Sequence, residues 1–142
     1  MKTANFCACT IASAVGFVAS CVASDVTGHL AQTPAEMFAA YVAALRTEGS
    51  KHVLATFVVP EARERIRLPE RIDRYEITLT RIIDDNEAAR LNHEAGSSFY
   101  RAGDRQLTVL ESHSGFTYVY YYLLRPSGNS WRIYDYASAP KD

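Results

Sequence analysis

The stretch FTYVYYYLLR, from Phe116 to Arg125, is the strongest strand signal in this chain. It is rich in aromatic and branched residues, which favour extended backbone. The tetrapeptide Pro126-Ser127-Gly128-Asn129 follows as an unambiguous turn, and SWRIYDYA, residues 130–137, returns as a further strand. These two strands should therefore be the closing hairpin of an antiparallel sheet.

Side chains alternate between the two faces of a strand, so the tyrosines of this stretch divide into two sets. Tyr118, Tyr120 and Tyr122 share one face with Phe116 and Leu124, and Tyr121 lies on the other with Val119 and Leu123. Both faces are apolar or amphipathic, as expected of a central strand. One face should pack on helices, and the other should line a pocket or meet a second subunit.

Upstream, alternating apolar residues predict a strand over 75–83 and another over 106–112. We also expect a returning strand over 87–95, which includes His93, and a short strand at 99–100. The chain before them is helical in pattern. Thr33-Pro34-Ala35-Glu36 can form a capping box, an apolar stripe continues to Leu45, and Gly49 ends the helix.

Ser50 can cap a second helix. The charged run 61–74 reads as a solvated helix that Pro69 interrupts. Helices first and strands afterwards predict an α+β domain, with N-terminal helices packed on a curved antiparallel sheet of four to six strands.

Residues 1–24 carry one charged side chain and end in small residues, as a secretory signal peptide does. Two cleavage sites fit. Val22-Ala23-Ser24 suits a general signal peptidase that cuts before Asp25, and Val18-Ala19-Ser20-Cys21 resembles a bacterial lipobox, in which Cys21 is acylated. We expect a protein exported to the periplasm or beyond, or lipid-anchored in the envelope, with a tether over 25–32 and one domain over 33–138.

The remaining composition limits the classes of function. The 142-residue chain has a net charge of −1 and no long basic run, so we expect no nucleic-acid partner. All three cysteines precede residue 22, so no disulfide is expected in the mature domain. No phosphate-binding loop, nucleophile elbow or metal-ligand spacing occurs, so we expect no metal and no cofactor.

Two segments resemble a known family. Thr33 to Gly49, TPAEMFAAYVAALRTEG, resembles the opening helix of NTF2-like domains, and SGNSWRIYDY resembles their last hairpin. The resemblance spans roughly residues 33–138 and implies a cone-shaped fold with an open end that often holds a small apolar ligand. Some members of the family are isomerases or dehydratases, and others only bind ligands or dimerise. A cystatin-like arrangement is the nearest alternative.

Enzymes of that family use an inward-facing Asp or His as a base with tyrosine donors. By alternation Asp135 should share the apolar face of Trp131 and Ile133, or else lie at the rim paired with an arginine. We take Asp135 and His93 as candidate catalytic residues. Candidate ligand-binding residues are Tyr41, Tyr118, Tyr120, Tyr122 and Trp131. His52 and His113 are expected at the surface.

Three functions are consistent with these patterns. The first is a non-enzymatic exported domain that binds a small apolar ligand or an envelope protein partner through the tyrosine-rich sheet face. The second is an acid–base enzyme of isomerase or dehydratase type. The third is a structural homodimer. We expect contact with a membrane only through the acyl chain that Cys21 would carry.

Overall fold

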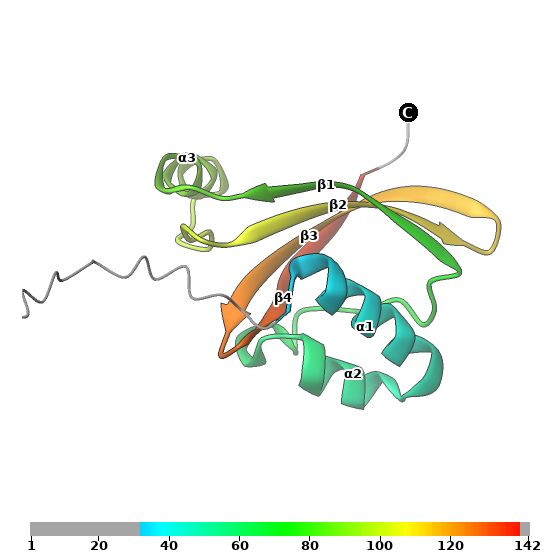
Figure 1. The fold of residues 1–142 in the computed structure, drawn as a ribbon. Helices are drawn as coiled ribbons and strands as arrows, with labels where there is room; N and C mark the ends of the chain where they lie inside the picture. Colours follow the sequence, from blue (N-terminus) through cyan, green and yellow to red (C-terminus); the bar gives the residue numbers. More distant parts are fainter. Residues whose placement is uncertain (1–31, 140–142) are drawn as a thin grey trace, which may run out of the picture.

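The computed structural model describes residues 32–139, which form an α+β domain. The expected signal peptide, Cys21 and nearly all of the expected tether lie outside these residues. Four strands form an antiparallel sheet in the order β1-β2-β3-β4, and α1 and α2 lie against one side of it (Figure 1). The α+β class, the N-terminal helices and the antiparallel sheet are thus confirmed. None of the described helices is long and apolar enough to cross a lipid bilayer.

The sheet is a meander of β1 (Arg74–Ile82), β2 (Arg105–His113), β3 (Phe116–Ser127) and β4 (Ser130–Ala139). Ser114 and Gly115 make the tight β2–β3 turn with positive φ angles of 51° and 87°, and Gly128 turns β3 into β4 with φ 62°. β3 pairs with both β2 and β4, so it is a central strand, as its two apolar faces predict.

Helices α1 (Pro34–Thr47) and α2 (Ser50–Phe57) cover the inner face of the sheet. The predicted capping box is present, because the Thr33 hydroxyl accepts from the Glu36 N–H and the Glu36 carboxylate accepts from the Thr33 N–H. Gly49 is the N-cap of α2, and Ser50 is its first residue. The apolar stripe of α1 packs onto Leu107, Val109, Tyr122, Leu124 and Ile133 of the sheet to form the main core.

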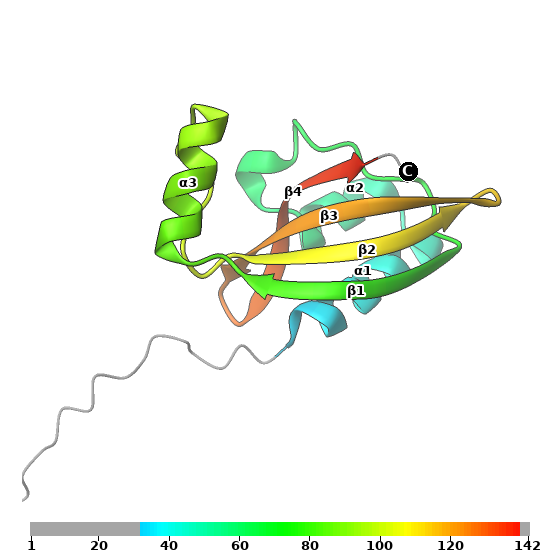
Figure 2. The same ribbon diagram turned by 90° about the horizontal axis from the view of Figure 1, so that it is seen from above.

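The predicted strand over 87–95 is wrong, because this segment forms helix α3 (Asp85–Ala95). Asp84 caps it by accepting from the Glu87 N–H, and Gly96 ends it in the left-handed conformation with φ 59°. Residues 99–100 are not a strand either. Figure 2 shows α3 at the end of the sheet opposite the β2–β3 turn. There its Ala88 forms a small second cluster with Ile83 and Leu123.

The charged run 61–74 is not the predicted helix. It begins as one 3₁₀ turn, η1 (Pro60–Ala62), and then crosses to β1 as irregular backbone. The side chains of Ile66 and Ile72 point from this backbone into the main core. The Arg63 guanidinium donates to the carbonyl oxygens of Ala55 and Val58 at the end of α2. The arginine therefore satisfies carbonyl groups that the helix leaves without partners.

A β-bulge alters the predicted faces of β4. Leu124 pairs with Ile133 but Leu123 pairs with Asp135, so Tyr134 is the extra residue. Trp131 and Ile133 keep the inner face, as predicted. Beyond the bulge the alternation is reversed, because Tyr136 lies opposite the buried Tyr122 and Asp135 lies opposite Leu123 on the outer face. The prediction that Asp135 shares the face of Trp131 is therefore wrong.

Candidate functional site

A carboxylic acid lies fully buried on the inner face of the sheet. Glu111 of β2 has no exposed surface, and its register neighbours are Tyr75 of β1 and Tyr118 of β3. The Tyr122 hydroxyl donates to Glu111 Oε1 at 2.6 Å. Burial raises the pKa of the Glu111 carboxyl, against the hydrogen bonds from Tyr122 and His113, which act to lower it. A buried acid with a raised pKa is a candidate for a functional site as well as a structural one.

His113 connects this buried acid to the surface. It is the last residue of β2, and its side chain keeps 20% of its surface exposed. Its Nε2 lies 2.9 Å from Glu111 Oε2, and its Nδ1 lies 2.8 Å from the carbonyl oxygen of Arg71. Both ring nitrogens are therefore engaged by the protein itself.

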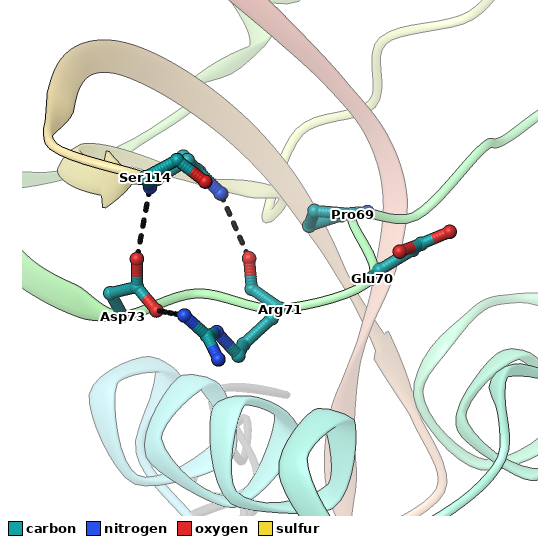
Figure 3. Close-up of a pocket in the computed structure, with 6 residues that line it drawn as sticks. Pro69, Glu70, Arg71, Asp73 and Ser114 are labelled. Carbon is teal, nitrogen blue, oxygen red and sulfur yellow. Dashed lines mark hydrogen bonds and ion pairs between the residues drawn. The ribbon is translucent and has the colours of Figure 1, made fainter.

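An open pocket of about 390 Å³ lies over His113. Its other walls are Ser114 in the β2–β3 turn and residues of the 69–73 segment, which precedes β1. Figure 3 shows Asp73 accepting from the Ser114 N–H and pairing with the Arg71 guanidinium. The Ser114 N–H is the main cause that lowers the pKa of Asp73, and Arg71 adds to it. The pocket rim thus carries an ionised carboxylate beside a guanidinium.

Aromatic rings lead from the main core to His113, which lines the pocket, although none of the tyrosines lines it. Tyr122 stacks on Tyr136 at 5.4 Å between ring centroids, and Tyr120 lies 6.0 Å from Tyr136 and 6.4 Å from Tyr118. His113 lies 5.8 Å from Tyr120 and 6.2 Å from Tyr118. We call Tyr118, Tyr120, Tyr122 and Tyr136 the tyrosine row. Exposure rises along it, from the fully buried Tyr122 to Tyr118, which is 39% exposed.

The five predicted ligand-binding residues fall into three places. Tyr118 and Tyr120 lie in the accessible part of the tyrosine row, and Tyr122 lies at its buried end. Tyr41 of α1 is fully buried with its ring 6.1 Å from that of Tyr122, and its hydroxyl has no hydrogen-bond partner among the described residues. Trp131 lies apart from these residues, near the β3–β4 turn, where the Arg105 guanidinium packs over its ring.

The two predicted catalytic residues are not joined to each other by any hydrogen bond or ion pair in the described region. Asp135 Oδ1 accepts from Arg65 Nη1 at 2.6 Å, which is the arginine-paired alternative stated above. His93 is exposed on α3. Neither residue lines the pocket.

The sequence reasoning missed Glu111 and described His113 only as a surface residue. A signal was present, because Leu107, Val109, Glu111 and His113 alternate along one strand. Strict period-two alternation places the acid and the imidazole on the same inward face as Leu107 and Val109. A carboxylate on an apolar face requires a partner, and Tyr122 and His113 supply it.

Residues 32–139 contain no group of three or more His, Asp or Glu side chains that could hold a metal ion. Comparisons with known proteins give no match: no family model fits this chain, and no curated protein or solved structure is significantly similar to it.

Proposed function

We propose that this domain is an exported, non-enzymatic binding module that takes a small apolar ligand at the accessible end of the tyrosine row. The observation that carries the proposal is the continuous set of rings from the core to His113, with Tyr118 39% exposed beside it. Half-exposed tyrosines offer large, rigid apolar surfaces and a hydroxyl that can still be solvated. A flat or ring-bearing molecule fits this chemistry.

Two features argue against acid–base catalysis at this site in the conformation that the structure describes. A general base needs a free lone pair within reach of the substrate proton. Both nitrogens of His113 already have protein partners, and Glu111 is covered by its neighbours. The alternative, an acid–base enzyme of isomerase or dehydratase type, would require His113 to release one of these partners. Asp135 is held by Arg65, and His93 lies outside the pocket, so neither supports that alternative.

Membership of the NTF2-like superfamily is part of the same proposal. It is supported by the capping-box helix, by the helical pair on one face of a four-stranded meander, and by the Trp131–Ile133 start of the last strand. In that fold the sheet bends into a cone whose open end would correspond to the pocket beside the β2–β3 turn. Helix α3, between β1 and β2, departs from the expected arrangement.

A matched pair of tyrosines tests the binding site. Tyr118 and Tyr121 are both 39% exposed on β3 but lie on opposite faces of the sheet. The fluorescent apolar probe 8-anilinonaphthalene-1-sulfonate should bind the wild-type protein, and Tyr118→Ala should weaken binding about tenfold, the order expected for loss of one aromatic contact. Tyr121→Ala should leave it unchanged. Equal effects of the two substitutions would refute the proposed site.

The third function, a homodimer that pairs sheet on sheet, would use the outer face, where Leu79 and Tyr121 are exposed. Sedimentation velocity over a range of protein concentrations tests it. We expect a single species at all concentrations. A dimer that Tyr121→Ala dissociates would favour this alternative instead.

Export is tested separately by the intact mass of the mature protein recovered from a bacterial envelope. We expect a chain that starts at Asp25. A chain that starts at Cys21 and carries acyl groups would show that the domain is anchored to a membrane and that the lipobox is used.

A further inference from the structure

Two arginines lie directly opposite each other on the outer face of the sheet. Arg125 of β3 pairs in register with Arg132 of β4, and their chain neighbours Leu124 and Ile133 are buried in the main core on the inner face. Opposite residues of antiparallel strands project from the same face with Cβ atoms about 5 Å apart, and like charges in such a pair destabilise the sheet. This pair of cations therefore requires neutralising groups.

Arg125 has some of the partners that it requires, but not all of them. The residue is only 6% exposed. Its Nε and Nη2 donate to the Asp104 carboxylate at 3.0 and 2.7 Å, and Nη2 also donates to the Phe99 carbonyl oxygen. Its Nη1 is buried and has no hydrogen-bond partner within residues 32–139. A buried N–H group of a cation is costly to leave without an acceptor, so Nη1 requires a further one.

Arg132 has the same deficit. Its Nε is buried without a hydrogen-bond partner in the described part of the chain. Three buried side-chain atoms of the described residues lack a partner: two belong to this pair of arginines, and the third is the Tyr41 hydroxyl in the main core. The unmet donors of the outer face are thus concentrated at one cross-strand pair. Because Arg132 is only half-buried, a solute can approach it from solvent.

The neighbouring carboxylates do not balance the charge. Asp104 pairs with Arg125, and Asp135, three residues after Arg132 on β4, pairs with Arg65. These three arginines and two aspartates leave one positive charge in excess, on Arg132. Guanidinium groups bind oxyanions through parallel N–H···O bonds, and two guanidinium groups on neighbouring strands can bind one anion from two sides.

We propose that Arg125 and Arg132 bind a small oxyanion, a phosphate or sulfate group, whose oxygens accept from Arg125 Nη1 and Arg132 Nε. Both nitrogens are buried, so the Arg132 side chain must turn to admit the anion. A free anion can enter in this way, whereas a headgroup held at a bilayer surface cannot. The site lies on the face opposite the tyrosine row, so it is independent of the proposed apolar ligand and gives the domain a second ligand.

Isothermal titration calorimetry of the mature protein with inorganic phosphate tests the site, at pH 7 and at constant ionic strength held with sodium chloride. We expect the wild type to bind with a dissociation constant on the order of 1 mM, which a few charge-assisted hydrogen bonds can supply. Arg132→Gln should weaken binding about tenfold or more. Arg74→Gln is the control, because Arg74 is an exposed arginine on the outer face of β1, opposite Ser112, and should bind as the wild type.

Arg132→Lys separates a built site from simple charge attraction. Lysine keeps the positive charge and loses the forked donor, so phosphate binding should weaken about fivefold. Arg125 is unchanged in all variants, because its bonds to Asp104 belong to the fold. Absence of binding by the wild type, or equal binding by the wild type and either Arg132 variant, would refute the site.

Vesicles of phosphatidylglycerol distinguish the source of the phosphate group. In a sedimentation assay the wild type should stay in the supernatant at physiological salt. Sedimentation with the vesicles that Arg132→Gln abolishes would overturn the assignment of a free anion, because the headgroup would then be what Arg132 binds. Binding of phosphate only above about 100 mM would be an adventitious ion only, and would also overturn it.

Discussion

At the scale of single residues, Tyr122 joins the hydrophobic core to the buried carboxyl group of Glu111. Tyr122→Phe keeps the ring and removes the donor, which leaves Glu111 Oε1 buried without a partner. We expect the free energy of unfolding to fall by about 1–3 kcal/mol, measured by urea denaturation. Tyr118→Phe, at a half-exposed position of the same face, should change it by less than about 0.5 kcal/mol. Equal stability of wild type and Tyr122→Phe would mean that this hydrogen bond contributes nothing.

A second residue-scale prediction concerns the buried ion pair at the other end of the sheet. Asp104 receives two hydrogen bonds from Arg125, whose guanidinium also lies 3.6 Å from the centre of the Tyr134 ring. Asp104→Asn would turn an amide towards a buried cation, which should cost about 3–5 kcal/mol of stability.

The matched control for Asp104→Asn is an exposed ion pair. Glu94→Gln breaks the pair of Arg90 with Glu94 on the surface of α3, and thermal denaturation should detect almost no loss, because surface pairs contribute little. A loss of stability in Asp104→Asn no larger than that in Glu94→Gln would show that burial adds nothing to the Asp104–Arg125 pair.

At the scale of the elements, α3 depends on its own ends more than on the core. It buries only Ala88 against the sheet, beside Ile83 and Leu123. Asp84→Ala removes the N-cap and should weaken the helix by about 1 kcal/mol. Hydrogen exchange of the α3 amides should become about fivefold faster, while exchange in β2 and β3 stays unchanged, because short, lightly packed elements open locally.

Asn86→Ala, in the first turn of α3 and exposed, is the control and should not speed exchange. Global acceleration in Asp84→Ala would contradict local opening and would make α3 part of the main cooperative unit.

The helices and strands also show how much of the fold could be predicted from the sequence. Strands β1 to β4 and the capped α1 were predictable, because alternation, turn residues and a capping box are local signals. The segment 87–95 was mistaken for a strand because Asp84-Asp85-Asn86 suits a turn as well as a helix start. The bulge at Tyr134 was not predictable, since it is set by pairing with Leu123 and Leu124. It removed Asp135 from the inner face and placed Tyr136 there, so one unpaired residue changed the composition of the candidate site.

At the scale of the whole molecule, the site depends on segments that are distant in the sequence. Glu111 and His113 lie on β2, Tyr122 lies on β3, and the Arg71 carbonyl precedes β1. Alternation along β2 indicates the inward face for Glu111 and His113, but it does not indicate their partners on β3 and before β1. The contact between His113 and the Arg71 carbonyl oxygen exists only because the meander brings the 69–73 segment back beside the end of β2, so no local motif predicts it.

The same assembly predicts how stability varies with pH. Glu111 has a pKa raised above 4.5, so its contribution to stability is complete below that value and is lost as pH rises through the folded-state pKa. Asp73 and Glu36 have pKa values lowered from 3.8 and 4.5 by hydrogen bonds from Ser114 and Thr33, so their contributions are present above those values and are lost as pH falls. We therefore expect maximum stability in mildly acid solution.

Urea denaturation from pH 3 to pH 9 measures this profile. The alkaline slope should belong to Glu111, because the tyrosines around it have pKa values raised above 10 and stay neutral in this range. Glu111→Gln should flatten the slope between pH 5 and pH 9 and leave the acid slope intact, whereas Asp73→Asn should reduce the acid slope alone. If Glu111→Gln keeps the wild-type alkaline slope, another group titrates there, and the buried acid is not the pH-sensitive element of the fold.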